Sequence, residues 1–175
     1  MARSRVALLR TGRATVLADY QRQVARAAID AGAGLILGHH AHILKGIEFY
    51  RGRAIFYSLS NFAIDVRMTP EHAASKGFRE IQALAPDWKP NFDSLFNFPP
   101  DSRMTGIVRV AIEKNGECEI AFLPAYINDN AQPEILKPAD ERFAKVVDYL
   151  RWCCTEQSLD VRLTTKGNLV RVDSA

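Results

Sequence analysis

Cysteine is scarce in this chain of 175 residues: it has three, and two of them, Cys153 and Cys154, are adjacent. An odd number of cysteines with adjacent members does not predict a disulfide framework. Long apolar runs are missing too, because no stretch approaches the roughly 18 residues of a membrane-spanning helix. The apolar residues 6–9 are too few for the core of a signal peptide. The chain as written is therefore expected to be cytoplasmic, with no transmembrane segment.

A large excess of charge of either sign is also lacking. The chain has 23 Lys and Arg against 20 Asp and Glu, a net charge of +3. This balance does not favour nucleic acid as the main partner. With 47% apolar and 25% charged residues, the composition excludes a disordered chain, a collagen-like repeat and a coiled coil. It predicts one soluble globular domain with a sizeable core.

The pattern from residue 17 to residue 37 predicts a helix, a turn and a strand. Residues 17–31 have apolar side chains at helical spacing, so we expect the core-facing stripe to consist of Leu17, Tyr20, Val24, Ala27, Ala28 and Ala31. Gly32 stands where a helix C′ residue belongs. Residues 35–37 are a short apolar run between two glycines, which predicts a buried strand. This order is typical of α/β proteins.

The rest of the chain predicts hairpins, one further helix and a long loop. Hairpins are expected at 47–57, at 107–123 around Asn115-Gly116, and at 163–172. Asp140 can cap a helix whose apolar face contains Phe143, Val146, Val147 and Leu150. Residues 67–103 hold many Pro and aromatic residues, with a helix expected near 71–84, and a loop of that length is usually functional. The expected class is α/β (α+β), with a mixed or antiparallel sheet.

Three of the four histidines lie within four positions, in Gly38-His39-His40-Ala41-His42. They follow the predicted strand at its carboxyl end, where α/β sheets place ligands. His40 and His42 have a spacing that presents both rings to one face of an extended loop, and neutral imidazole binds transition metals. His39 would then point elsewhere, as a substrate contact or a hydrogen-bonded support. Solvated loop histidines are the alternative.

Polar residues also follow the strand of the first hairpin. Ser58, Asn61 and Asp65 could reach the same mouth as the histidines, although turn chemistry is the favoured explanation for them. Turn chemistry is favoured more strongly for residues 126–130. The pair Cys153 and Cys154 is interpreted as packing, and His72 as an exposed residue without a role.

The pieces of residues 19–65 resemble the capsule-synthesis CapA family, which is related to the calcineurin-like metallophosphoesterases. The likeness rests on the order Tyr20 to Gln23, residues 28–33, the 35–42 segment, Ile47-Glu48 and residues 55–62. Residues 123–128 and the Pro-rich loop resemble the tail of one subgroup. The resemblance implies an αββα sandwich with a two-metal site at the strand ends. It implies that His40 and His42 are the metal-ligand pair and that Asn61 lies near that site. We take His39 and Asn61 as the catalytic candidates.

The sequence departs from the family pattern in two ways. Ser60 replaces a family glycine, which costs of order 1 kcal/mol if that glycine adopts positive φ. The family's earlier segments, an Asp-x-His, a Gly-Asp and an Asn-His or Asn-x-Glu, have no counterpart here, and the chain has no histidine before His39. We therefore expect residues 1–18 to be an atypical basic start at a fragment boundary, and residues 19–175 to be the C-terminal part of a CapA-like domain.

The leading hypothesis is a C-terminal portion of a CapA-like protein of capsule, poly-γ-glutamate or exopolymer synthesis. The divalent ions implied are Mn, Fe or Zn, at a site that is incomplete in this chain, because two-metal sites need further carboxylate ligands. Such a portion would not be catalytically competent alone. An anionic small molecule or polymer is the substrate class, and proteins of a capsule-synthesis complex are possible partners. Full-length relatives are often exported or anchored, so the resemblance leaves localisation open.

The alternatives are an active phosphoesterase of unknown substrate and a non-catalytic subunit of a polymer-synthesis complex.

Overall fold

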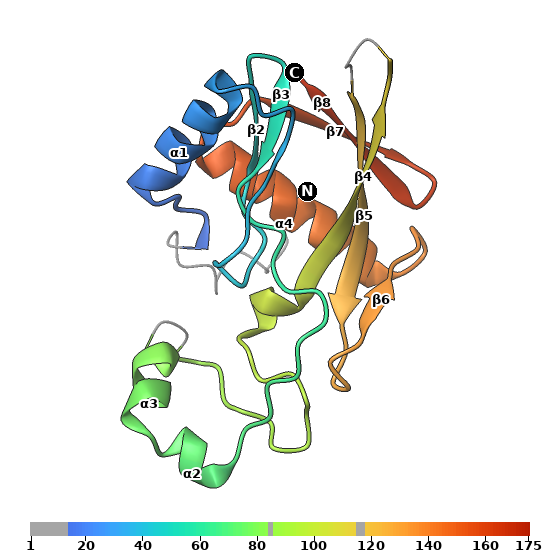
Figure 1. The fold of residues 1–175 in the computed structure, drawn as a ribbon. Helices are drawn as coiled ribbons and strands as arrows, with labels where there is room; N and C mark the ends of the chain where they lie inside the picture. Colours follow the sequence, from blue (N-terminus) through green and yellow to red (C-terminus); the bar gives the residue numbers. More distant parts are fainter. Residues whose placement is uncertain (1–13, 84–85, 115–117) are drawn as a thin grey trace.

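The computed structural model describes residues 14–83, 86–114 and 118–175 and has the expected α+β architecture, with two separate sheets (Figure 1). The smaller sheet has the order β1-β3-β2, from β1 (Ile36–Leu37), β2 (Ile47–Tyr50) and β3 (Arg53–Phe56). β1 is parallel to β3, and β2 is antiparallel to it. The β2–β3 turn has positive φ at Arg51 and Gly52, as a two-residue hairpin turn requires. This hairpin prediction is confirmed.

Strand β1 corrects one expectation. It lies at the edge of the sheet, because it pairs with β3 alone among the described strands. The side chain of Leu37 is 47% exposed, so the strand is not fully buried as expected. Gly32 does end the preceding helix with a φ of +106°.

The face that helix α1 (Asp19–Asp30) buries also differs from the prediction. Ala25 and Ile29 are its buried residues, whereas Tyr20 and Val24 are 59% and 63% exposed. The helix has two apolar stripes, one with Tyr20 and Val24 and one with Ala25 and Ile29. Contacts with other elements determine which of the two is buried. Arg22 donates to the Gln157 carbonyl at 2.7 Å and Arg26 bonds Glu48 of β2, which turns the stripe between these arginines inward.

Residues 61–103 form a long excursion from the small sheet to the large one. The single helix expected near 71–84 is two short helices, α2 (Pro70–Ala73) and α3 (Lys76–Gln82). Thr69 caps α2 by accepting from the His72 amide, and His72 is exposed as expected. Both helices stand apart from the sheets at the bottom of Figure 1. The excursion returns through η3 (Pro100–Arg103), which leads directly into β4.

The larger sheet has the order β4-β5-β8-β7, with β6 (Pro133–Ile135) paired to β5. Its strands are β4 (Met104–Ile112), β5 (Cys118–Ile127), β7 (Val161–Lys166) and β8 (Leu169–Ser174), and every pairing is antiparallel. The two further hairpins predicted from the sequence are thus confirmed. The Asn115-Gly116 turn lies outside the described residues, as do residues 1–13 of the basic start.

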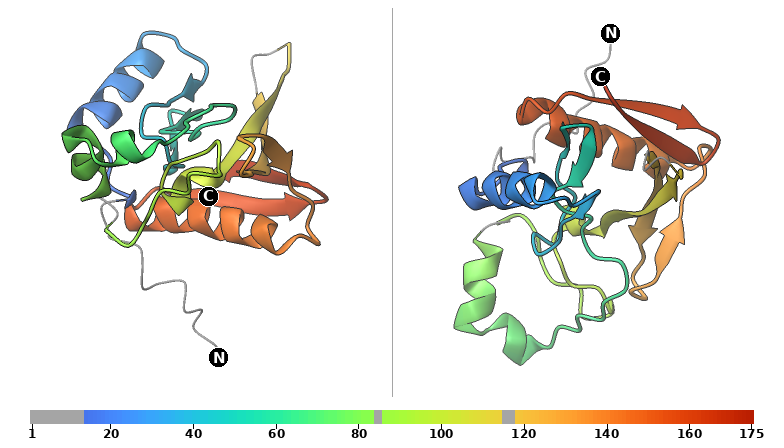
Figure 2. Two further views of the ribbon diagram at one scale, coloured as in Figure 1. Left: turned by 90° about the horizontal axis from the view of Figure 1, so that it is seen from below. Right: turned by 45° about the horizontal axis from the view of Figure 1, so that its top comes forward.

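Helix α4 (Glu141–Glu156) joins the two sheets into one core. Asp140 accepts from the Arg142 amide at 2.9 Å, and the four predicted apolar residues are buried. At the end of the helix, Cys154 Sγ accepts from the Ile47 amide of β2. The small sheet lies between α1 and α4 (Figure 2). The two sheets and two helices share one cluster of buried residues, which includes Ile55, Phe56, Phe122, Tyr149 and Val170.

Cys153 and Cys154 serve packing, which agrees with the sequence interpretation. Cys153 and Cys154 are buried, and burial raises the pKa of Cys154 to about 11. Because the thiolate is the reactive form, we expect Ellman's reagent at pH 8 to modify only Cys118 in the folded protein. All three should react in denaturant. Rapid modification of two or three thiols without denaturant would contradict this packing.

Candidate functional site: the histidine loop

The histidine loop (residues 38–42) begins at the carboxyl end of β1, where the backbone of Gly38 is fixed against β3. The Gly38 amide donates to the Phe56 carbonyl at 2.7 Å, and the Gly38 carbonyl accepts from the Leu59 amide at 3.0 Å. A Cβ at Gly38 would lie 2.5 Å from the Tyr57 carbonyl oxygen. The loop therefore leaves the sheet at a point where only glycine fits.

Left-handed backbone gathers at this loop. His40 has a φ of +81°, His42 of +56° and Ser60 of +67°. These are three of the six non-glycine residues with positive φ in the part of the chain that the structure describes. Such conformations cost free energy and cluster at binding and catalytic sites. Ser60 has the positive φ that was the stated condition for a cost of order 1 kcal/mol to a serine at this position.

The amide of Asn61 fixes the ring of His42. Asn61 Nδ2 donates to the His42 carbonyl at 3.4 Å, which identifies Oδ1 as the acceptor that faces the ring. The distance from His42 Nδ1 to this Oδ1 is 2.6 Å. Nδ1 is therefore the donor, and in the neutral ring Nε2 keeps its lone pair. Asn61 itself is buried, and its backbone carbonyl accepts a hydrogen bond from the Thr105 hydroxyl.

His39 has the same arrangement with a weaker contact. Its Nδ1 lies 3.4 Å from the Ser60 carbonyl oxygen, which can only accept, so Nδ1 is the donor. This hydrogen bond fits the expected supporting role for His39. Ser60 in turn donates from Oγ to the carbonyls of His42 and Ser102, at 3.3 and 3.2 Å. Ser60 thus holds the histidine loop and η3 together.

Sequence reasoning missed Phe98, which packs against His42. Their ring centroids are 4.9 Å apart and the ring planes differ by 20°. The ring of His40 lies 6.5 Å from that of His42 at 43°. Phe98 belongs to the Pro-rich and aromatic segment that was expected to be functional, and this composition was the available signal. The separation of His42 and Phe98 in the sequence gave no indication that their rings meet.

Two other polar candidates take different roles. Ser58 is buried, and its hydroxyl accepts from the Ser60 amide at 3.2 Å, so it supports the turn. Asp65 is exposed and pairs with Arg67 at 3.7 Å. The 126–130 segment shows the expected turn chemistry, since Asn128 Oδ1 accepts from the amides of Asn130 and Gln132.

The donor atoms of the loop suit a transition metal in part. His39, His40 and His42 are all exposed, and a metal-binding histidine usually donates its second ring N–H to an oxygen, as His42 and His39 do. Within residues 14–83, 86–114 and 118–175, however, no group of three or more His, Cys, Asp or Glu side chains is placed to hold one ion. The described residues thus bring three imidazole groups into one loop without assembling a three-ligand set.

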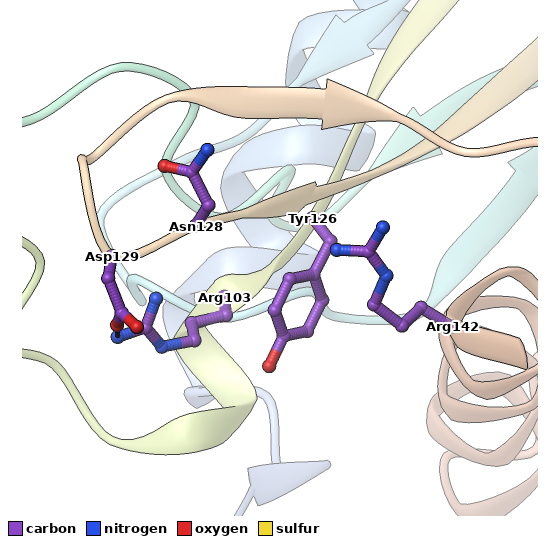
Figure 3. A pocket seen from close by; sticks show the side chains of 5 residues that line it. All are labelled: Arg103, Tyr126, Asn128, Asp129 and Arg142. Atoms are coloured by element: carbon purple, nitrogen blue, oxygen red, sulfur yellow. Dashed lines mark hydrogen bonds and ion pairs between the residues drawn. The ribbon is translucent and has the colours of Figure 1, made fainter. Parts of the chain in front are cut away.

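A depression of about 300 Å³ lies apart from the histidine loop, where β5 leaves the larger sheet (Figure 3). It is lined by Arg103, Tyr126, Asn128, Asp129 and Arg142. Arg103 pairs with Asp129 at 2.6 Å, while Arg142 pairs with Glu134 and Asp140 and lies over the Tyr126 ring. Hydrogen bonds to these two carboxylates raise the pKa of Arg142. Because both guanidinium groups are already neutralised, the pocket is not a ready site for an anion.

Comparison with known proteins agrees with the likeness seen in the sequence. Residues 11–66 match the family model described as bacterial capsule synthesis protein PGA_cap. The chain is 62% identical over 47 residues to the PGA biosynthesis protein CapA of Bacillus subtilis (strain 168), which covers 27% of this chain and 12% of that protein. It is 49% identical over 45 residues to the capsule biosynthesis protein CapA of Bacillus anthracis, covering 26% and 11%.

A third relative is the uncharacterized protein y4sH of Sinorhizobium fredii (strain NBRC 101917 / NGR234), 53% identical over 53 residues, which cover 30% of this chain and 12% of that protein. The chain thus spans about an eighth of the length of these curated relatives. The family match contains α1, the small sheet, the histidine loop and Asn61. None of the helices in the described part of the chain has the length and hydrophobicity needed to cross a bilayer.

Proposed function

We propose, from the premise that residues 11–66 belong to the CapA capsule-synthesis family, that this chain supplies the histidine side of a divalent-metal site. The site would act on an anionic group during synthesis of a capsule polymer, and poly-γ-glutamate is one candidate polymer. Mn, Fe and Zn are the candidate ions. The chain alone is not expected to be a competent hydrolase, because a two-metal centre needs bridging carboxylates as well.

The observation that carries this proposal is the contact between Asn61 and His42. A solvated loop histidine needs no buried amide to fix its tautomer, whereas a metal ligand gains from one. Here the 2.6 Å contact at Nδ1 means that, in the neutral form of this exposed ring, Nε2 is the nitrogen with a free lone pair. Positive φ at His40 and His42 adds a cost that a loop without a role would not retain.

Each residue of the site has a separate proposed role. His40 and His42 would hold the ion through ring nitrogen, and Asn61 would orient His42. His39, supported by the Ser60 carbonyl, would present its Nε2 edge to the substrate. The bound ion supplies Lewis acidity toward a phosphoryl or similar anionic group and lowers the pKa of a water molecule.

The test is metal content, measured by elemental analysis of the purified chain after dialysis against Mn²⁺, Fe²⁺ or Zn²⁺. We expect at most one weakly held ion per chain, and its loss in the His40→Ala/His42→Ala variant, because both proposed ligands are gone. His72→Ala is the matched control, since His72 is exposed on α2. Equal metal content in the double variant and the wild type would reject the proposed ligands. Nearly two ions per chain would show that the site is complete and that an active phosphoesterase is correct.

The lack of a three-ligand group in the described residues favours one second candidate, a non-catalytic subunit of a polymer-synthesis complex. The two candidates differ in cells. If the site is catalytic, His40→Ala in the complete protein should abolish capsule formation. Normal capsule formation by that variant would support the structural subunit.

A further inference from the structure

Residues 94–98, which we call the wall segment, have a rigid backbone although they lie in the long excursion. Ser94, Phe96 and Asn97 are buried at 4% exposure or less. The Leu95 amide donates to the Asp129 carbonyl at 2.7 Å, and the Leu95 carbonyl accepts from the Val66 amide at 2.7 Å. The segment is therefore attached both to the chain that leaves the small sheet and to the end of β5.

Side chains strengthen this attachment. Asn97 Nδ2 donates to the carbonyls of Ser94 and Val66, at 2.8 and 3.2 Å. Arg103 extends across from the pocket of Figure 3: its Nη2 donates to the Phe96 carbonyl at 3.2 Å, and its guanidinium lies 5.2 Å from the centre of the Phe96 ring. Buried, fully bonded polar networks of this kind hold one conformation.

The wall segment ends at Phe98, and this ring covers one face of His42. Phe98 packs on the buried Phe96 at 5.5 Å, so its own position is fixed. His42 is then held twice, at Nδ1 by Asn61 and on one ring face by Phe98. His42 is nevertheless exposed to solvent.

We infer that Phe98 is a positioning residue for His42 and that the wall segment keeps the Nε2 edge of this imidazole directed toward the ligand. This inference rests on the proposed metal-binding function. It adds a second requirement, contributed by residues beyond the segment that matches the family model. Without the ring of Phe98, the His42 side chain regains rotational freedom, and the hydrogen bond to Asn61 is no longer protected from water.

The first readout is metal affinity. In Phe98→Ala we expect Zn²⁺ to bind about tenfold more weakly by calorimetry, which is the size of effect that residues supporting a metal ligand produce. Phe98→Tyr keeps the ring and should keep the affinity. Phe92→Ala is the matched control, because Phe92 is in the same excursion and 53% exposed. Unchanged affinity in Phe98→Ala would overturn the inference.

The second readout is independent of metal. In the metal-free wild type, ¹⁵N NMR of the imidazole at a pH where His42 is neutral should show the proton on Nδ1. In Phe98→Ala the two tautomers should be mixed. If the wild type binds no metal but the tautomer still depends on Phe98, the proposed function fails while the positioning role stands. A pure Nδ1–H form in Phe98→Ala would reject the role itself. If Phe98→Ala does not fold, Phe98→Leu, which fills similar space without a ring, is judged by the same two readouts.

Discussion

Gly38→Ala is expected to lower the free energy of unfolding by about 3 kcal/mol and to disorganise the histidine loop. The new Cβ would lie 2.5 Å from the Tyr57 carbonyl oxygen and 2.8 Å from the Phe56 carbonyl oxygen. Phe56 O cannot move easily, because it accepts the Gly38 amide at 2.7 Å inside the sheet, and the Tyr57 amide is itself bonded to the Gly46 carbonyl at 3.2 Å. The backbone must therefore separate β1 from β3 at the point where the histidines begin.

Urea denaturation measures the loss of stability, and Gly34→Ala is the matched control. Gly34 lies four residues earlier, on the other side of β1, and a Cβ there would meet nothing within 4 Å. Its substitution should change stability by less than about 1 kcal/mol, or raise it, because alanine restricts the unfolded chain. Equal effects of the two substitutions would show that the close approach at Gly38 does not constrain the fold. Zn²⁺ binding should decrease in Gly38→Ala alone.

Local chemistry made the hairpins and the helix ends predictable. The turn at Arg51-Gly52 requires positive φ, which glycine allows at low cost, and Asp140 accepts a hydrogen bond from an amide in the first turn of its helix. The apolar face of α1 was not predictable in this way. Its two apolar stripes have similar periodicity. Which of them is buried depends on Arg22 and Arg26, whose hydrogen-bond partners are distant in sequence.

The site was predictable to the same extent. The histidines and Asn61 follow adjacent strands of one sheet, so their meeting follows from the order of short elements. The packing of Phe98 on His42 depends instead on the path of residues 61–103. The hydrogen bonds of Leu95 to Val66 and Asp129 determine this path. Composition indicated that this segment matters, but no periodicity indicates which of its aromatic rings reaches the site.

The burial of one carboxylate also could not be predicted from the sequence. Glu48 lies in β2 with its side chain 9% exposed. Arg26 donates to its Oε1 from Nε at 3.0 Å and from Nη2 at 2.5 Å, and the Tyr57 hydroxyl donates to Oε2. Burial first, and the hydrogen bond to Glu48 next, raise the pKa of Tyr57 well above its usual range. This group attaches α1 to the sheet beneath the histidine loop.

The raised pKa of Tyr57 predicts a loss of stability in alkali. The neutral hydroxyl is favoured in the folded state, so its contribution is fully present below about pH 10, the pKa of an unfolded tyrosine. As the pH rises above this value, the unfolded chain releases the proton first and the contribution decreases. Thermal unfolding between pH 9 and pH 11 should therefore show a smaller decrease in Tm for Tyr57→Phe than for the wild type.

Glu48→Ala is expected to cost about 3 kcal/mol of unfolding free energy, because it leaves a buried hydroxyl and a partly buried guanidinium without their acceptor. The triple variant Arg26→Met/Glu48→Met/Tyr57→Phe removes all the polar partners together and should lie within about 1 kcal/mol of the wild type. Urea denaturation of both variants separates the cost of a broken network from the net worth of an intact one. A triple variant as unstable as Glu48→Ala would mean that the ionic cluster itself, rather than satisfaction of its members, stabilises the contact between α1 and the small sheet.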